Sequence, residues 1–328
     1  MWNFLIKINK RLVVAIPAMM AAGYLLGITA TPATLKNLKA LIMPLTFLMV
    51  YPMMVALNIK HLQEGIKNVR LQVATQFINF AIIPFVAFFL GKYFFPEQPY
   101  LALGLLLASL LPTSGMTISW TGFAKGNLYA AINMTVIGLT LGSLATPLYV
   151  QVLLGAKVDV DLMLVVKQIL LIVFFPMALG YVTRQVFLKK YGPQEFKKTW
   201  APRFPSLSTV GVLGIVFVAI ALKARGVSEN PAILGSIFVP LLIIYSFNYA
   251  LSTVVGKLFF VRGDAIALVY GTVMRNLSIA LAIAINAFGS KGADTALIIA
   301  LSYIIQVQSA AWYVKYTDKI FGPAPSAE

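Results

Sequence analysis

Polar side chains gather in two short stretches of this otherwise apolar sequence. The first, residues 111–127, contains Pro112, Gly115 and five hydroxyl residues: Thr113, Ser114, Thr117, Ser119 and Thr121. Non-helical backbone at membrane depth is tolerated where protein buries it or a water-filled cavity solvates it. Transporters use such interrupted helices as binding sites, because the freed amides and carbonyls can contact a solute. We predict a helix break and a binding site here; the simpler alternative is a Pro-kinked spanning helix.

The second stretch is centred on Arg275, in the run Gly271-Thr272-Val273-Met274-Arg275-Asn276-Leu277-Ser278. A charged side chain in the membrane interior costs a few kcal/mol or more, so it marks a functional site by default. None of the ten acidic residues lies at the centre of an apolar segment. Because guanidinium suits bidentate recognition of carboxylate or phosphate, we expect an anionic solute as its partner. Alternatively, Arg275 binds helix-end carbonyls and latches two segments together.

The elements that must position these residues are membrane-spanning helices. Hydrophobic residues make up 60% of the 328 residues and charged residues 11%, with a mean hydropathy of +0.87. A soluble domain has about 25% charged residues, so we predict an all-α polytopic membrane protein in a lipid bilayer. The net charge of +16 is scattered and predicts no nucleic-acid partner.

The residue inventory excludes several chemistries. With no cysteine and one histidine, the chain cannot form thiolate, iron–sulfur or imidazole-cluster sites, so we expect no cofactor and no metal. An intramembrane enzyme would need a base and a nucleophile or a metal cluster. Apart from Asp264 at the end of one segment, the predicted spans contain no His, Cys, Asp or Glu, so we predict that the chain is not an enzyme.

Ten apolar segments are each about long enough to span a bilayer. Seventeen of the 26 Lys and Arg residues fall in connections on the side of the N-terminus, seven on the opposite side, and Lys167 and Arg275 within spans. This asymmetry predicts both termini in the cytoplasm, in a multi-pass protein of the plasma or inner membrane. The segments are 12–30, 37–58, 71–95, 100–124, 128–154, 163–186, 205–223, 232–256, 263–288 and 295–314.

Four ordered echoes indicate an internal repeat, for example Asn79-Phe80-Ala81 and Asn248-Tyr249-Ala250. We predict two five-helix repeats, residues 1–159 and 160–328. Because five is odd, the second repeat must be inverted in the membrane. Inverted repeats with paired broken helices are typical of secondary transporters, with the binding site where the repeats meet.

These residues resemble the bile acid:sodium symporter superfamily over nearly the whole chain. The Pro112 break with Phe123-Ala124-Lys125-Gly126-Asn127 is similar to the fourth span of the sodium-coupled members, and Asn79-Phe80-Ala81-Ile82-Ile83-Pro84 to their third. The resemblance implies alternating access between a panel domain (spans one, two, six and seven) and a core domain (spans three to five and eight to ten). The discontinuous helices four and nine would cross in the core.

The resemblance also bears on the sodium sites. It places Thr117 and Thr135 on hydroxyl sodium ligands, and Asn79 where relatives carry a glutamine. Four positions depart from the pattern, since Ile118, Ala131, Gly271 and Arg275 replace a ligand asparagine, serine, glutamate and glutamine. We therefore expect remnants of ion sites at Thr117, Thr135, Asn79 and Met274, and a tethered cation, Arg275, in place of sodium.

The resulting prediction is a secondary transporter for a small organic anion, with its hinges at Pro112, Gly115 and Gly271. The substrate site is predicted to comprise Arg275, Asn276, Ser278, Thr113, Ser114, Thr117, Asn79 and Asn248. The arsenite-permease branch of the superfamily is also similar, because Trp120 is followed by Ala124-Lys125-Gly126. Its functional cysteine would align with Thr113, and this chain has none. Efflux of arsenite or antimonite is therefore the alternative, and a passive channel is a weaker one.

Overall fold

The computed structural model describes residues 2–9, 11–56, 68–155, 158, 162–229, 231–288 and 291–323. Helices account for nearly all of them, as expected where a bilayer forces each segment to satisfy its own backbone hydrogen bonds. In chain order they are α1 (Trp2–Asn9), α2 (Leu12–Thr29), α3 (Pro32–Ala40), α4 (Ile42–Ala56), α6 (Val69–Phe77), the π-helix η2 (Ile78–Ile82), α7 (Ile83–Phe94), α8 (Pro99–Leu110), α9 (Gly115–Phe123), α10 (Leu128–Leu154), α11 (Leu162–Ile169), η3 (Leu170–Phe174), α12 (Phe175–Glu195), η4 (Phe196–Trp200), α13 (Arg203–Glu229), α14 (Ala232–Phe259), α15 (Arg262–Val273), α16 (Leu277–Ala287) and α17 (Gly292–Phe321).

Seven of the described helices are long and apolar enough to cross a membrane, judged by length and composition. Shorter apolar helices, at Val14–Thr29, Pro99–Leu110 and Leu277–Ala287, overlap the predicted segments 12–30, 100–124 and 263–288. The all-helical, multi-pass prediction is therefore confirmed. The count of ten crossings and the inverted repeat remain predictions, and the predicted boundary at 159/160 lies outside the described residues.

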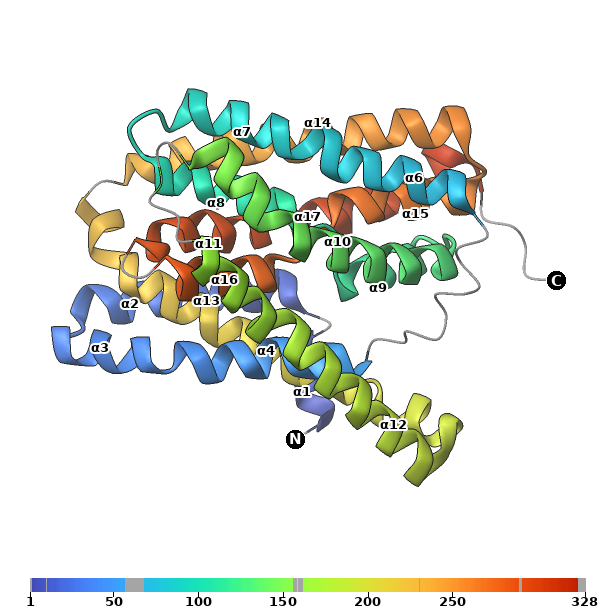
Figure 1. The fold of residues 1–328 in the computed structure, drawn as a ribbon, viewed down its shortest axis with the longest axis horizontal. Helices are drawn as coiled ribbons and strands as arrows, with labels where there is room; N and C mark the ends of the chain where they lie inside the picture. Colours follow the sequence, from blue (N-terminus) through green and yellow to red (C-terminus); the bar gives the residue numbers. More distant parts are fainter. Residues whose placement is uncertain are drawn as a thin grey trace.

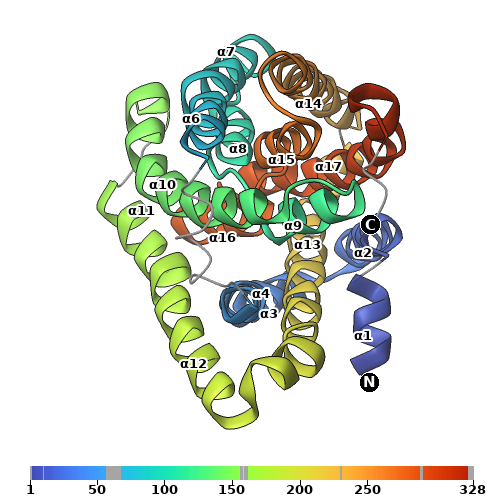
Figure 2. The ribbon, with the colours of Figure 1, turned by 90° about the vertical axis from the view of Figure 1, so that its right-hand side faces the viewer.

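The helices pack in two groups that are visible in Figures 1 and 2. In the first, here called the α13 group, α13 packs against α2 and α4, and α4 packs against α12. In the second, the α17 group, α17 packs against α8, α14 and α16, with α6, α7, α10 and α15 around them. In Figure 2 the α13 group lies below the α17 group. The two groups meet where α13 contacts α17 and where α4 contacts α16.

Close helix approach within the α13 group depends on small residues. A Cβ atom added to Gly23 of α2 would lie 2.5 Å from the Phe217 carbonyl oxygen of α13. One added to Gly180 of α12 would lie 2.8 Å from backbone and side-chain atoms of Met54 in α4. Lipid tails are as apolar as leucine, so membrane helices associate largely through such tight packing. The α13 group is thus a closely packed unit.

Candidate functional site

The two predicted breaks are present and pair with each other. Between α8 and α9, residues 111–114 leave the helix, and between α15 and α16 residues 274–276 do the same. An isolated antiparallel bridge joins Pro112 and Arg275. The Thr113 amide donates to the Met274 carbonyl at 2.7 Å, and the Asn276 amide donates to the Leu111 carbonyl at 2.7 Å. Backbone groups freed by one break are therefore satisfied by the other. We call this pairing the crossing.

Thr113 is the most strained residue of the crossing. Its φ is +65°, a left-handed conformation that is a genuine outlier for a β-branched residue. The side chain is fully buried, and its hydroxyl lies within hydrogen-bonding distance of three carbonyls, 2.6 Å from Pro112 and 3.3 Å from each of Met134 and Thr135 in α10. Thr113 therefore faces α10. Strain of this kind costs about 1–3 kcal/mol and concentrates at functional sites.

Each new helix after the crossing begins with a polar cap. The Ser114 hydroxyl accepts from the Met116 amide at 3.2 Å, and the Thr117 hydroxyl accepts from the Ser114 amide at 3.1 Å, which forms a capping box on α9. The Asn276 side chain accepts from the Ile279 amide at 3.2 Å and caps α16. Both caps satisfy amides that the break leaves without helical partners. Thr117 and Asn276 are buried and have structural roles in the crossing.

The end of α15 is held by two asparagines. Asn79 Nδ2 donates to the Gly271 carbonyl at 3.0 Å, and Asn248 Nδ2 donates to the Thr272 carbonyl at 2.8 Å. Both side chains are buried, and they come from η2 and α14. A Cβ atom at Gly271 would lie 2.5 Å from Met134 Sδ, so the hinge predicted there is a point of close packing. Asn79 and Asn248, which occupy matching positions in the two predicted repeats, thus donate to consecutive carbonyls at the end of α15.

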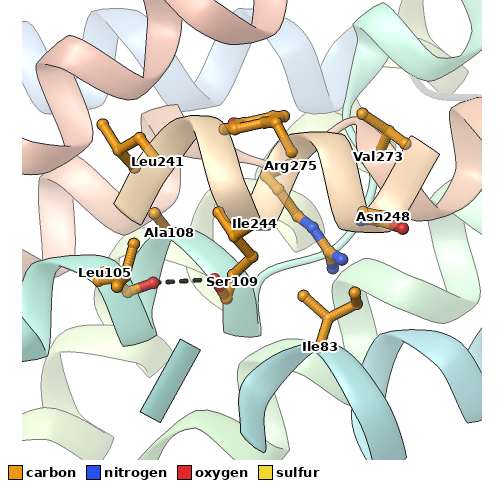
Figure 3. Close-up of a pocket in the computed structure, with 10 residues that line it drawn as sticks. Ile83, Leu105, Ala108, Ser109, Leu241, Ile244, Asn248, Val273 and Arg275 are labelled. Carbon is orange, nitrogen blue, oxygen red and sulfur yellow. Dashed lines mark hydrogen bonds between the residues drawn. The ribbon is translucent and has the colours of Figure 1, made fainter. Parts of the chain in front are cut away.

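Arg275 has a fixed backbone and an unpaired side chain. Its amide donates to Gln306 Oε1 at 2.8 Å, and Gln306 Nε2 donates to its carbonyl at 3.2 Å. The side chain is 4% exposed, and Nη1 and Nη2 have no hydrogen-bond partner. Figure 3 shows the guanidinium between Asn248 and Ile83. The alternative prediction, in which the guanidinium binds helix-end carbonyls and links two segments, is not what the structure shows. The link is made instead by the backbone of Arg275, which is hydrogen-bonded to Gln306.

The guanidinium points into a small cavity of about 10 Å³, about the room that one water molecule requires. This cavity lies between α7, α8 and α14, and no described acidic side chain lines it. The lining residues are Ile83, Leu105, Ala108, Ser109, Leu241, Ile244, Tyr245, Asn248, Val273 and Arg275.

A second cavity, of about 240 Å³, lies between the crossing and the α13 group. Its walls are mostly apolar, with hydroxyl groups from both sides and no described acidic side chain. Ser278 and Tyr303 share a 2.6 Å hydrogen bond in its wall. The lining residues are Met53, Ala56, Ser114, Gly115, Met116, Ile118, Ser119, Pro205, Ser208, Thr209, Val212, Arg275, Leu277, Ser278, Tyr303 and Gln306.

Only some of the eight predicted substrate residues line one of these two cavities. Arg275 lines both cavities, Ser114 and Ser278 line the larger one, and Asn248 lines the smaller one. The remaining four line neither cavity: Thr113, Thr117 and Asn276 are buried at the crossing, and Asn79 is buried against the end of α15.

The sequence interpretation missed the wall contributed by α13. Ser208 and Thr209 line the larger cavity opposite the crossing. The available signal was the hydroxyl-rich start of the seventh predicted segment, Pro205-Ser206-Leu207-Ser208-Thr209, which resembles residues 112–117 in composition.

The predicted remnants of ion sites are occupied by the chain's own contacts. Thr135 donates to the Ala131 carbonyl at 2.7 Å, and the Met274 carbonyl accepts from Thr113. Asn79 Oδ1 is buried without a partner, so it retains one free acceptor.

A comparison with protein families identifies the fold's relatives. The model of the Sodium Bile acid symporter family matches residues 43–230, more than half of the chain. The chain belongs to this family. The resemblance found in the sequence is confirmed, and family membership makes the chain a multi-pass secondary transporter.

Two arsenical-resistance proteins and one uncharacterized transporter are similar to this symporter-family member. The arsenical-resistance protein Acr3 of Alkaliphilus metalliredigens is 26% identical over 255 residues, which cover 72% of this chain and 71% of the relative. Acr3 of Corynebacterium glutamicum is 23% identical over 258 residues, covering 75% and 70%. An uncharacterized transporter of Synechocystis is 25% identical over 309 residues, covering 83% and 79%.

Proposed function

We propose that the protein moves a small organic anion by alternating access through the larger cavity. The observation that carries this proposal is the position of that cavity, which has the crossing on one side and α13 with α4 on the other. A site bounded by two separately packed helix groups can be exposed to either side of a membrane when one group moves against the other. On this proposal the α13 group is the panel domain and the α17 group is the core domain.

The chemistry of the cavity favours an anion with an apolar body. Apolar side chains such as Met53, Ile118 and Val212 provide contacts for hydrocarbon. Hydroxyl donors remain at Ser114, which accepts from the Met116 amide, and at the Ser278–Tyr303 pair, whose shared bond uses only one of its two hydrogens. Ser119 and Ser208 already donate to the carbonyls of Gly115 and Met49. Donors without a nearby carboxylate suit a solute that carries acceptors and negative charge. A cation would find no counter-charge among the described lining residues.

Arg275 is proposed to replace a coupled sodium ion. Its guanidinium lies in the α17 group next to Asn248, which holds the Thr272 carbonyl at the end of α15. Two unit charges about 8 Å apart attract by about 2 kcal/mol at an effective dielectric constant of about 20. A charge fixed beside the cavity can therefore attract an anion without contacting it.

One end of the proposed pathway is closed by an ion pair. Lys223 of α13 lies 2.5 Å from Asp294 in the first turn of α17, and Asn286 of α16 contacts Thr46 of α4 at 3.5 Å. Lys223 is fifteen positions along α13 from Ser208 of the cavity, about 22 Å at the rise of an α-helix. We propose that the ion pair closes the non-cytoplasmic side, with both termini in the cytoplasm.

Efflux of arsenite or antimonite is the second candidate, because two of the relatives are named for arsenical resistance. The position that would align with a functional cysteine is Thr113, which is buried against α10 and does not line the larger cavity. A thiolate-like role at this position is therefore unsupported. Protection of a metalloid-sensitive host strain by the expressed protein would favour this candidate over anion transport.

The test of anion transport is uptake of labelled sulfonates (methanesulfonate, butanesulfonate and benzenesulfonate) into proteoliposomes, with and without a sodium gradient. Uptake without sodium is expected, and replacing Arg275 by Gln should weaken benzenesulfonate binding by about thirtyfold, which corresponds to about 2 kcal/mol. Binding of neutral benzenesulfonamide should change little, which makes it the matched control. Strict sodium dependence, or full activity in Arg275→Ala, would rule out the tethered cation.

A further inference from the structure

The positive charge of Arg275 has no neutralising partner within the described chain. Its side chain is 4% exposed, both terminal nitrogens lack hydrogen-bond partners, and no described acidic residue lines either adjoining cavity. Guanidinium is not deprotonated in proteins, so this charge persists. Something outside the described chain must therefore balance it during part of the transport cycle.

We infer that the protein is an anion exchanger rather than a net symporter. The inference rests on the proposed function. A sodium ion that accompanies a solute can dissociate on the far side and leave an uncharged site for the return step. Arg275 is covalently attached and held through its backbone by Gln306, so it cannot leave. The empty site must return with an unpaired positive charge, whereas a site loaded with a monovalent anion returns neutral.

The surroundings of the guanidinium make the unpaired return unfavourable. The small cavity has room for about one water molecule, so bulk solvent cannot solvate the charge fully. Its walls are largely aliphatic, including Ile83, Leu105, Leu241, Ile244 and Val273. A buried charge without a partner is strongly unfavourable in such surroundings. The return step should therefore be fast with an anion bound and slow without one.

The fixed charge of Arg275 also determines which charge the exchanged solute should carry. A monovalent anion brings the combined charge of site and solute to zero, whereas a dianion leaves one negative charge. Exchange of one monovalent anion for another moves no net charge through the membrane. The exchanged solutes are thus expected to be monoanions with apolar bodies that fit the larger cavity, and exchange should be insensitive to the membrane potential.

The experiment compares two modes of transport in proteoliposomes of the full chain. Labelled benzenesulfonate, or the labelled sulfonate with the largest uptake, is supplied to vesicles that contain either the same unlabelled sulfonate or none. The membrane potential is clamped with potassium and valinomycin. We expect exchange to be at least about tenfold faster than net uptake, which corresponds to about 1.4 kcal/mol of barrier. Net uptake should vary with the potential and exchange should not.

Variants at Arg275 connect the effect to its charge. Arg275→Gln should bring the two rates together, and Arg275→Lys, which keeps the charge, should preserve their ratio. A thermal melt shows whether each variant is folded, and the Lys variant decides the matter if the Gln variant is not. Absence of uptake in both modes would overturn the proposed function together with the inference. Uptake at equal rates in the two modes would overturn the inference alone.

Discussion

Replacing Gly142 by Ala tests the geometry of the crossing directly. Gly142 lies in α10 against the first break, where an added Cβ would be 2.8 Å from Pro112 Cδ, 3.0 Å from the Leu110 carbonyl oxygen and 3.5 Å from Leu111 Cα. These atoms have little freedom to move. The Leu111 carbonyl is bonded to Asn276 of the other break, and Pro112 lies in the bridge to Arg275.

The magnitude follows from two opposing effects. Overpacking of a tightly packed interior costs about 1–3 kcal/mol, and a clash with paired backbone belongs near the upper end of that range. Alanine is favoured over glycine in a helix by about 1 kcal/mol, which offsets part of the cost. We therefore expect Gly142→Ala to destabilise the protein by about 2 kcal/mol. At an unfolding entropy of about 2.1 cal/mol/K per residue, that corresponds in a chain of 328 residues to a fall of about 3 °C in apparent Tm.

The assay is thermal denaturation in detergent, followed by intrinsic tryptophan fluorescence, with Gly235→Ala as the matched control. Gly235 is also a glycine inside a helix, α14, but it is exposed, and no atom lies within 4 Å of the position that an added Cβ would take. The control should have an unchanged or slightly raised Tm. If Gly142→Ala and the control have the same apparent Tm, α10 does not approach the break as closely as the structure shows, and the reasoning is refuted.

Two further predictions concern contacts that hold helices together. Because the chain contains no cysteine, the double variant Lys223→Cys/Asp294→Cys can be joined by a reducible bifunctional thiol reagent, and the crosslink should stop uptake until a reductant is added; uptake that is unchanged after crosslinking would show that this contact need not open. Asp264 accepts from Asn68 at 2.6 Å and from Asn127 at 2.7 Å, and these asparagines cap α6 and α10. Asp264→Asn should cost about 1–3 kcal/mol, because one of the two amide donors then meets another donor; an unchanged melting temperature would contradict these bonds.

Composition and local pattern sufficed for much of the fold. Most of the apolar segments lie within a few residues of the observed helices, because a bilayer leaves a long apolar run no alternative to a helix. The helices that begin near residues 162, 203 and 292 extend further at their polar C-terminal ends, which hydropathy did not predict. The breaks were also predictable, since Pro112 cannot continue the α8 hydrogen-bond ladder and Arg275 cannot face lipid without cost. Resemblance then gave the family, which the comparisons confirm.

The sequence could not assign the polar residues near the breaks to solute or to structure. Thr113, Thr117 and Asn276 are of the same types as Ser114 and Ser278, yet the first three satisfy freed backbone groups and the last two face the larger cavity. In a one-dimensional pattern these roles look alike, because a hydroxyl or amide can cap a helix or bind a solute with the same atoms.

The sequence by itself therefore determined that this is an all-helical membrane protein with two broken helices and one buried arginine. The tertiary structure alone decided that the breaks pair with each other, that α13 supplies the opposite wall of the larger cavity, and that the guanidinium of Arg275 points into a space about the size of a water molecule. The physical reason is that these outcomes depend on which segments meet. Which segments meet is determined by the packing of helices that are far apart in the chain, and local hydropathy and helix propensity do not predict it.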